Sequence, residues 1–364
     1  MKRIRTSLII VIGFFWCFLA LSAQAQESDA QKLLLDSISY DKLDVAGVKT
    51  ALDKGANTNW VSDTKSRDGT NSVLGHLALS ALGSRKDERI EQKAVEILQV
   101  LFRAGAKLQA CDEKILFYPI SSGWVLFTEL LLKNGANPTR EVEGWTPMEI
   151  AVRYVQPSIV GLLRTYGVPP LESRIAAQLI LIKAAGDGNF SRMEEAIRNG
   201  AEVNGKDRRG ETALVASIPI PVITSKTYST IQYLLKKGAD PTIQGQERFG
   251  RTTALHLAIK QSRLIFDAEI KKKIENESLK DSPLYARLII QSLLQHGALV
   301  SARDSDGMTP LHIAAKYNNI VGAKMLIEAG SKIMPRDDKG KTPLDYAESA
   351  EMIKLLKAHR AKEN

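Results

Sequence analysis

Cysteine is scarce in this chain. Cys17 and Cys111 are the two cysteines among 364 residues, and Cys17 lies inside an apolar run near the N-terminus. A small fold held together by several disulfides is therefore excluded, and so is a zinc site built from clustered cysteines. Cys111 has no second cysteine at a useful spacing, so its role stays open between a buried thiol and a redox group.

Recognisable catalytic patterns are also missing. The sequence has no His-Glu-x-x-His, no phosphate-binding Walker loop, no Gly-x-Ser-x-Gly and no Cys-x-x-Cys. The segment "GDGN" at 186–189 resembles a glycine loop, but it favours a turn between two helices. His76, His296 and His359 stand at no metal-ligand spacing. We therefore predict a protein that is not an enzyme, with no cofactor, no metal and no small-molecule substrate.

Concentrated charge of one sign is absent as well. The formal net charge is +9, and Lys2, Arg3 and Arg5 contribute three of those positive charges. The remaining basic residues are spread along the chain and form no stripe, so we expect no nucleic-acid partner. The segment "IKKKIENESLK" at 270–280 is charged with both signs, which is typical of a solvated face.

The N-terminus has the three parts of a secretory signal. Lys2, Arg3 and Arg5 precede an apolar run from Leu8 to Leu21, which is short for a membrane span. Ala23-Gln24-Ala25 fits the small-x-small cleavage rule. We predict a cleavable signal peptide at 1–25, a folded domain at 26–364 and a periplasmic location. The alternative is an uncleaved N-terminal anchor.

A glycine recurs at similar intervals after short apolar helix patterns. Four of the intervals are 30, 32, 33 and 33 residues. Helices that end in a basic residue followed by glycine stop in the left-handed conformation. The glycines of this set are Gly55, Gly105, Gly135, Gly167, Gly200, Gly238, Gly297 and Gly330.

The phrase Thr-Pro-Leu-His-x-Ala at 309–314 stands in phase with these glycines, and weaker copies begin at Thr146, Thr212, Thr253 and Thr342. The period and this phrase resemble the ankyrin repeat, over nearly the whole chain after the leader. The resemblance implies an all-α solenoid with a β-hairpin turn and two antiparallel helices per repeat. We count about seven repeats, with an N-terminal cap at 26–60 and a C-terminal cap at 338–364.

The motif residues have structural roles under this interpretation. Thr253 and Thr309 would cap a helix, and Pro310 would occupy its first position. His256 and His312 would tie the hairpin to that helix. Three other repeats place Glu149, Val215 and Asp345 where the histidine stands. Pro119 falls inside an expected first helix, which predicts a kink there.

Three insertions are expected between the two helices of a repeat, at 83–92, 218–228 and 261–285. The first and third are rich in charge, whereas the middle one, "IPIPVITSKTY", is apolar and contains proline. The sequence leaves open whether any of them has a function.

Aromatic and arginine side chains at the hairpin tips are the candidate binding residues, because these residue types dominate interface energies. We expect them to be exposed and to stay out of the core. The predicted partner-binding residues are Trp60, Trp145, Arg208, Arg209 and Phe249.

These features together predict a non-catalytic, monomeric module that binds another protein in the periplasm through hairpin tips and the concave face. The partner's identity stays open. One interpretation is a protective or accessory factor for an envelope protein. The alternatives are an immunity-type inhibitor of a periplasm-acting toxin and a membrane-tethered scaffold held by an uncleaved leader.

Overall fold

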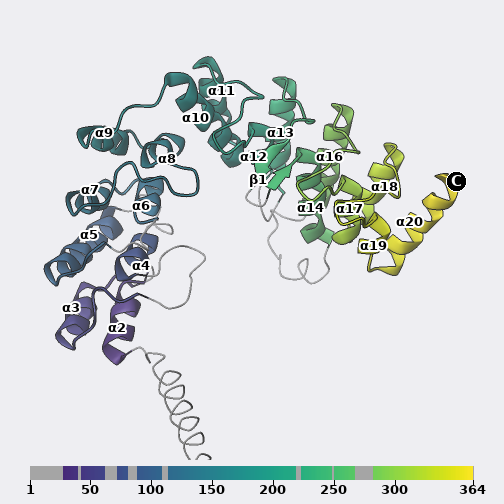
Figure 1. The fold of residues 1–364 in the computed structure, drawn as a ribbon. Coiled ribbons are helices and arrows are strands. Elements are labelled where there is room, and N and C mark those ends of the chain that lie inside the picture. Colours follow the sequence, from purple (N-terminus) through teal and green to yellow (C-terminus); the bar gives the residue numbers. More distant parts are fainter. Residues whose placement is uncertain are drawn as a thin grey trace, which may run out of the picture. The chain divides into compact units, whose positions relative to one another are not determined.

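A computed structural model of the chain describes residues 28–39, 42–61, 72–80, 88–108, 114–218, 223–247, 250–266 and 282–363. These residues form helices with one short two-stranded sheet (Figure 1). They divide into two compact units, Met1–Pro170 and Leu171–Asn364. The signal peptide predicted at 1–25, Cys111, Phe249 and the charged segment 270–280 lie outside the described residues.

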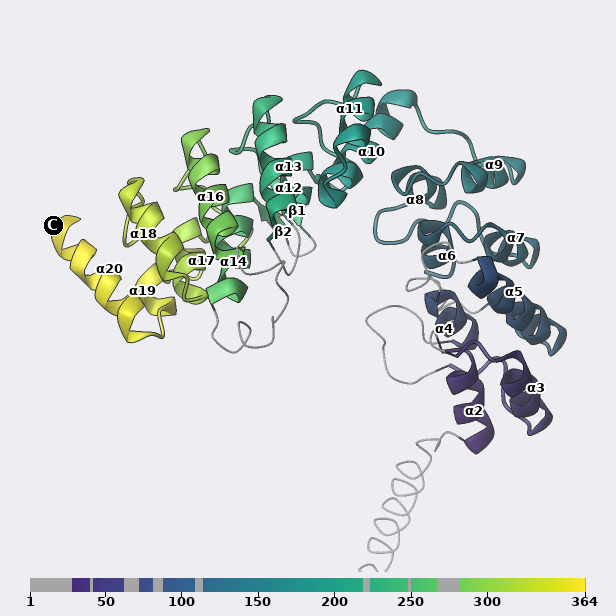
Figure 2. The same ribbon diagram turned by 180° about the vertical axis from the view of Figure 1, so that it is seen from behind.

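Unit 1 contains four helix pairs in its described part. First helices α4, α6 and α8 pack in series, and second helices α3, α5, α7 and α9 form a parallel series (Figure 2). The pairs are α2 (Asp29–Ser37) with α3 (Val45–Asp53), α4 (Val73–Leu79) with α5 (Glu88–Arg103), α6 (Phe117–Ser122) with α7 (Val125–Lys133), and α8 (Pro147–Arg153) with α9 (Pro157–Thr165).

Unit 2 continues the pattern with five pairs in its described part. The strands β1 (Gly245–Glu247) and β2 (Gly250–Thr252) pair antiparallel and form one hairpin. The helix pairs are α10 (Ser173–Asp187) with α11 (Phe190–Arg198), α12 (Ala213–Ala216) with α13 (Ser225–Lys236), α14 (Ala254–Phe266) with α16 (Ser282–Gln295), α17 (Pro310–Lys316) with α18 (Ile320–Glu328), and α19 (Pro343–Tyr346) with α20 (Ala350–Glu363).

The core of unit 2 is shared between neighbouring helix pairs. Leu181, Ile231, Leu255, Leu311 and Met352 come from five different pairs, are fully buried and belong to one continuous apolar cluster. A single pair of short helices cannot bury its own apolar face, so stacking supplies the stability. This arrangement confirms the all-α solenoid expected from the sequence.

Glycine ends the second helix of eight pairs, as the sequence predicts. The eight glycines have φ between +79° and +93°, a region that side chains with a Cβ rarely adopt. The eight are Gly55, Gly105, Gly135, Gly167, Gly200, Gly238, Gly297 and Gly330. The "GDGN" segment is also a turn between helices, since Gly188 ends α10 with φ +61° and Asn189 caps α11.

Pro119 does not kink a helix, so that prediction is wrong. Helix α6 begins at Phe117, which places Pro119 in its first turn. Backbone N–H groups in the first turn have no partner within the helix, so proline removes no hydrogen bond there.

The expected insertions are narrower than predicted, because their ends are helical. Residues 88–92 begin α5, residues 225–228 begin α13, and α14 extends to Phe266 before α16 starts at Ser282. Glu88 and Glu91 made the first insertion look like a charged loop, but acidic residues are favourable in the first turn of a helix. Ile218, Ile223 and Thr224 of the second insertion are described and lie outside the helices, whereas residues 83–87, 219–222 and 267–281 lie outside the described residues.

Candidate functional site: the hairpin tips and groove of unit 2

Three hairpin tips of unit 2 share one construction. An aspartate begins each tip, and its Oδ1 accepts hydrogen bonds of 2.8–2.9 Å from the backbone N–H groups two and four residues later. A glycine with φ between +71° and +80° follows three residues after the aspartate. The pairs are Asp207 with Gly210, Asp304 with Gly307, and Asp337 with Gly340. The aspartates thus hold the turns, and the residues between each aspartate and its glycine are exposed, apart from the half-buried Arg209.

Neighbouring tips are joined through their backbones. The N–H of Ser305 donates to the carbonyl of Arg251 at 3.0 Å, and the N–H of Asp338 donates to the carbonyl of Asp306 at 3.2 Å. Three successive hairpins of unit 2 are therefore hydrogen-bonded in a row. Their tip residues are held in a fixed order before any partner arrives.

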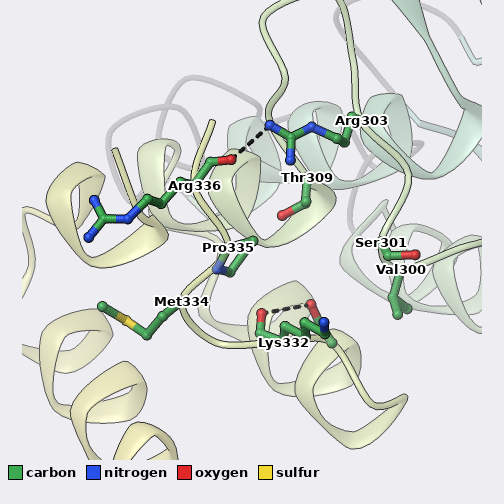
Figure 3. Close-up of a pocket in the computed structure, with 9 residues that line it drawn as sticks. Val300, Ser301, Arg303, Thr309, Lys332, Met334, Pro335 and Arg336 are labelled. Atoms are coloured by element: carbon green, nitrogen blue, oxygen red, sulfur yellow. Dashed lines mark hydrogen bonds between the residues drawn. The ribbon is translucent and has the colours of Figure 1, made fainter. Parts of the chain in front are cut away.

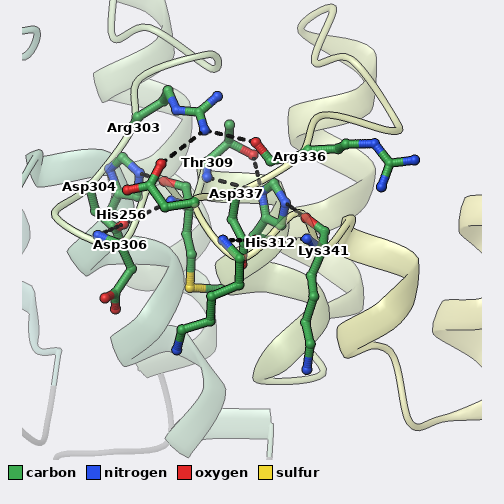
Figure 4. Close-up of polar contacts among 12 residues, drawn as sticks. His256, Arg303, Asp304, Asp306, Thr309, His312, Arg336, Asp337 and Lys341 are labelled. Carbon is green, nitrogen blue, oxygen red and sulfur yellow. Dashed lines mark hydrogen bonds and ion pairs between the residues drawn. The ribbon is translucent and has the colours of Figure 1, made fainter.

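Two buried histidines connect these hairpins to the helices behind them (Figure 4). Nδ1 of His312 accepts the backbone N–H of Thr309 at 3.0 Å, and Nε2 lies 3.0 Å from the carbonyl oxygen of Lys341 in the next hairpin. His256 repeats the arrangement, with Nδ1 2.7 Å from the Thr253 hydroxyl and Nε2 3.0 Å from the carbonyl oxygen of Met308. Each ring spans two adjacent repeats.

These contacts fix the protonation of His312. Because Nδ1 accepts a hydrogen bond and Nε2 faces a carbonyl, the ring is neutral with its proton on Nε2. Burial lowers the pKa of His312 and of His256, since both rings lose water that would solvate the charged form. Neither ring is available as a base or a metal ligand.

The Asp337 carboxylate carries a second contact from the following helix. The Tyr346 hydroxyl donates to its Oδ2 at 2.5 Å, and this hydrogen bond raises the pKa of Tyr346 to about 12. Burial opposes ionisation of Asp337, but the hydrogen bonds from Tyr346 and from the backbone of Lys341 and Lys339 outweigh it and lower the pKa of Asp337. The carboxylate is therefore ionised and committed to holding its turn.

A groove of about 390 Å³ lies between the hairpins at 250–252 and 304–308 and the first helices α14 and α17. Leu257, Met308 and Ile313 supply apolar surface. Charged groups of both signs border it: Arg251, Lys260, Lys316, Asp304 and Asp306. Such a mixture suits a surface of another macromolecule better than a small apolar ligand.

A cation recurs in the groove at one position of the repeat. Lys260 follows His256 by four residues, and Lys316 follows His312 by four. Residues four apart share a helix face, so both ammonium groups stand one turn beyond a buried histidine. Lys316 also lies 5.9 Å from the ring centres of Tyr317 and Tyr346. The sequence interpretation missed these residues, although their spacing from the motif could have identified them.

The predicted binding residues have different surroundings. Arg208 is exposed and Arg209 half-buried at the tip that Asp207 begins. Trp60 is half-buried beyond the end of α3, and its backbone N–H donates to the carbonyl of Asn57 at 3.2 Å. Phe249 lies outside the described residues. The structure thus brings Arg208 and Arg209 together and leaves Trp60 in the other unit.

Trp145 is buried, which contradicts its expected exposure. Only 4% of its surface is accessible, and its backbone pairs with Val142 across a tight turn. The Arg153 guanidinium lies 4.7 Å from the centre of its ring. The indole packs on its own repeat because a large apolar side chain beside the turn gains more by burial than by exposure. Arg153 occupies the same repeat position in unit 1 as Lys260 and Lys316 in unit 2.

Two kinds of feature are absent from the described residues. No group of three or more histidine, cysteine or acidic side chains among them could hold a metal ion. No helix in the same described ranges is long and apolar enough to cross a bilayer. The arrangement of fixed tips beside a groove of mixed charge can hold an extended or folded segment of another protein by non-covalent contacts.

Comparison with known proteins agrees with this architecture. The family model for ankyrin repeats (many copies) matches residues 293–347, the region of α16 to α19. The ankyrin repeat protein FPV240 of fowlpox virus (strain NVSL) is 28% identical over 132 residues, which are 34% of this chain and 31% of the viral protein. The chain thus matches about a third of the length of that curated relative. With the Thr-Pro-Leu-His motif and the stacked helix pairs, these matches support an ankyrin-repeat protein, and ankyrin repeats are typical of protein–protein interaction modules.

Proposed function

We propose that this protein is exported to the periplasm and binds a partner protein there through the tips and groove of unit 2. The observation that carries the binding site is the row of hairpins held by backbone hydrogen bonds beside a groove of mixed polarity. A surface fixed in advance loses little conformational entropy when it binds, which favours affinity. The role we propose is that of an accessory factor that protects an envelope protein.

The groove suits a partner segment with both acidic and apolar side chains. Arg251 and Lys316 are exposed at its border, while Leu257 and Ile313 offer buried apolar surface behind them. Arg208 and Arg209 extend the basic surface to a neighbouring tip. Long-range attraction from these cations would speed association with an acidic partner.

Charge reversal of the groove tests this proposal. The tagged protein is expressed in its native host, and its partner is captured from the envelope fraction and identified. We expect the double variant Arg251→Glu/Lys316→Glu to lose that partner while the protein stays folded. Lys354→Glu, an exposed position on α20, is the matched control and should retain the partner. Retention by the double variant would contradict the groove as the binding site.

The proposal of export depends on the signal-peptide pattern at the N-terminus, so a separate measurement tests it. Mass spectrometry of the protein from the envelope fraction should find a mature N-terminus at Gln26, because Ala23 and Ala25 satisfy the cleavage rule. An intact Met1 on folded, membrane-bound protein would instead support the anchored scaffold.

A further inference from the structure

A second pocket in unit 2 shares no described lining residue with the groove. It lies between the loops at 300–303 and 331–336, which lead from the second helices α16 and α18 to the hairpins that follow them. Its volume is about 690 Å³, within the range of sites that bind small molecules. We refer to it as the loop pocket (Figure 3).

Three positively charged side chains border the loop pocket. Arg303, Lys332 and Arg336 line it, and no aspartate or glutamate among the described residues does. The groove differs in this respect, since Asp304 and Asp306 line it beside its cations. Like charges gathered around one hollow create a positive potential that attracts an anion.

Backbone carbonyl oxygens orient the two guanidinium groups of the loop pocket. Nη2 of Arg303 donates to the carbonyl of Arg336 at 2.8 Å, and Nη1 of Arg336 donates to the carbonyl of Gly340 at 2.7 Å. Carbonyl oxygens hold a guanidinium but leave its positive charge in place. Each guanidinium has five N–H donors, so several remain for a second partner.

An ion pair with Asp338 compensates the charge of Arg303 weakly. Asp338 Oδ1 lies 3.4 Å from Nη2 of Arg303, and the two side chains are 65% and 50% exposed. An ion pair with that exposure contributes little and is easily exchanged for another anion. Lys332 is exposed and forms no ion pair with any described residue.

The remaining walls are partly apolar. Val300 and Ser301 lie on one side of the hollow and Met334 and Pro335 on the other (Figure 3). The Ser301 hydroxyl adds a hydrogen-bond donor, whereas the Ser331 hydroxyl donates to the carbonyl of Lys332 at 3.4 Å. A ligand that suits these walls carries its negative charge at one end and a small apolar body at the other.

We propose that the loop pocket binds an oxyanion, a phosphate or carboxylate group, carried on a small and partly apolar molecule. Arginine suits both groups because its donors match two oxygens at once. This site uses none of the groove residues, so it is independent of the proposed protein partner and could be occupied together with it.

Binding of three probes to the purified protein tests the proposal: inorganic phosphate, phenyl phosphate and benzoate, each followed by calorimetry or NMR. We expect phenyl phosphate to bind more tightly than inorganic phosphate, because the ring contacts Val300 and Met334. The comparison of phenyl phosphate with benzoate identifies the preferred anion, and tighter binding of either one supports the site. No binding of either at millimolar concentration would overturn it.

Single substitutions test whether phenyl phosphate binds in the loop pocket. Lys332→Ala removes an exposed ammonium that holds no structural contact, so the fold should be unaffected, and affinity for phenyl phosphate should fall at least about tenfold. Arg303→Lys keeps the charge but loses the paired donors and should also weaken binding. Lys316→Ala in the groove is the matched control and should bind normally. Unchanged affinity in Lys332→Ala and Arg303→Lys would refute the loop pocket as the site.

Discussion

The Nε2 atom of His312 lies 3.0 Å from the carbonyl oxygen of Lys341, while Nδ1 of the same ring accepts the N–H of Thr309. One side chain therefore satisfies the first turn of its own helix and the hairpin of the next repeat. His256 does the same one repeat earlier, with the carbonyl of Met308. Because the Thr309 N–H donates to Nδ1, the His312 ring is neutral and carries its proton on Nε2.

Stability should therefore decrease in mild acid. Burial lowers the pKa of both histidines in the folded chain, so between that pKa and the ordinary value of about 6.5 the unfolded state binds more protons. The histidine contribution is complete above about pH 6.5 and is lost as the pH falls below it. Urea unfolding at a series of pH values would measure this slope.

A double variant tests whether the two histidines cause this dependence of stability on pH. The double variant His256→Gln/His312→Gln is less stable at neutral pH, but its stability should change less between about pH 7 and pH 5.5. Asp337 has a lowered pKa and loses its contribution only at more acidic pH. An equal slope in the wild type and the double variant would rule the histidines out.

Alanine in place of glycine should have opposite effects at two positions. Gly200 has φ +93° and Gly161 lies within α9, and a Cβ would meet no atom within 4 Å at either position. Gly200→Ala should cost about 1–2 kcal/mol through backbone strain alone. Gly161→Ala should stabilise the protein by about 0.5–1 kcal/mol. Thermal or denaturant unfolding measures both, and effects of the same sign would contradict the repeat register.

The tip aspartates should stabilise the protein through the hydrogen bonds that they accept more than through their negative charge. Asp304→Ala leaves the N–H groups of Asp306 and Met308 without their acceptor and should cost about 1–2 kcal/mol. Asp304→Asn keeps an oxygen in the same place and should cost clearly less. If both variants lose the same stability, the negative charge of Asp304 matters rather than its hydrogen bonds.

Alanine substitutions at Trp145 and Arg208 should have different effects on the free energy of unfolding. Trp145→Ala empties a buried site and should destabilise the protein by about 3–5 kcal/mol. Arg208→Ala changes an exposed tip and should stay within about 0.5 kcal/mol of the wild type. Unfolding free energies test both, and a mild effect at Trp145 would mean that its surroundings are looser than described.

The repeat could be predicted from the sequence because its signals are local. A glycine that stops a helix and a threonine that starts one act within a few residues, so the helix ends at Gly200 and the start at Thr146 follow from short patterns. The burial of Trp145 could not be predicted in the same way. Whether a side chain beside a tight turn faces solvent depends on how it packs against residues such as Arg153.

The groove and the loop pocket were not predictable from motif matching alone. Both lie between repeats, so their lining depends on how one hairpin stacks on the next. Arg303 and Arg336 are 33 residues apart, and Arg303 donates to the Arg336 carbonyl only because adjacent repeats align. The predicted end of the first insertion was wrong for a different reason. The acidic residues in the first turn of α5 are as typical of a charged loop as of a helix start.

Site-specific photo-crosslinking shows which face of unit 2 touches the partner protein. A crosslinking residue is placed at Lys316, in the groove, or at Lys324, which is exposed on the second helix α18. Both variants are expressed in the native host and irradiated. We expect an adduct with one defined envelope protein from position 316 and none from position 324. The same adduct from position 324 and not from position 316 would contradict the groove as the binding site.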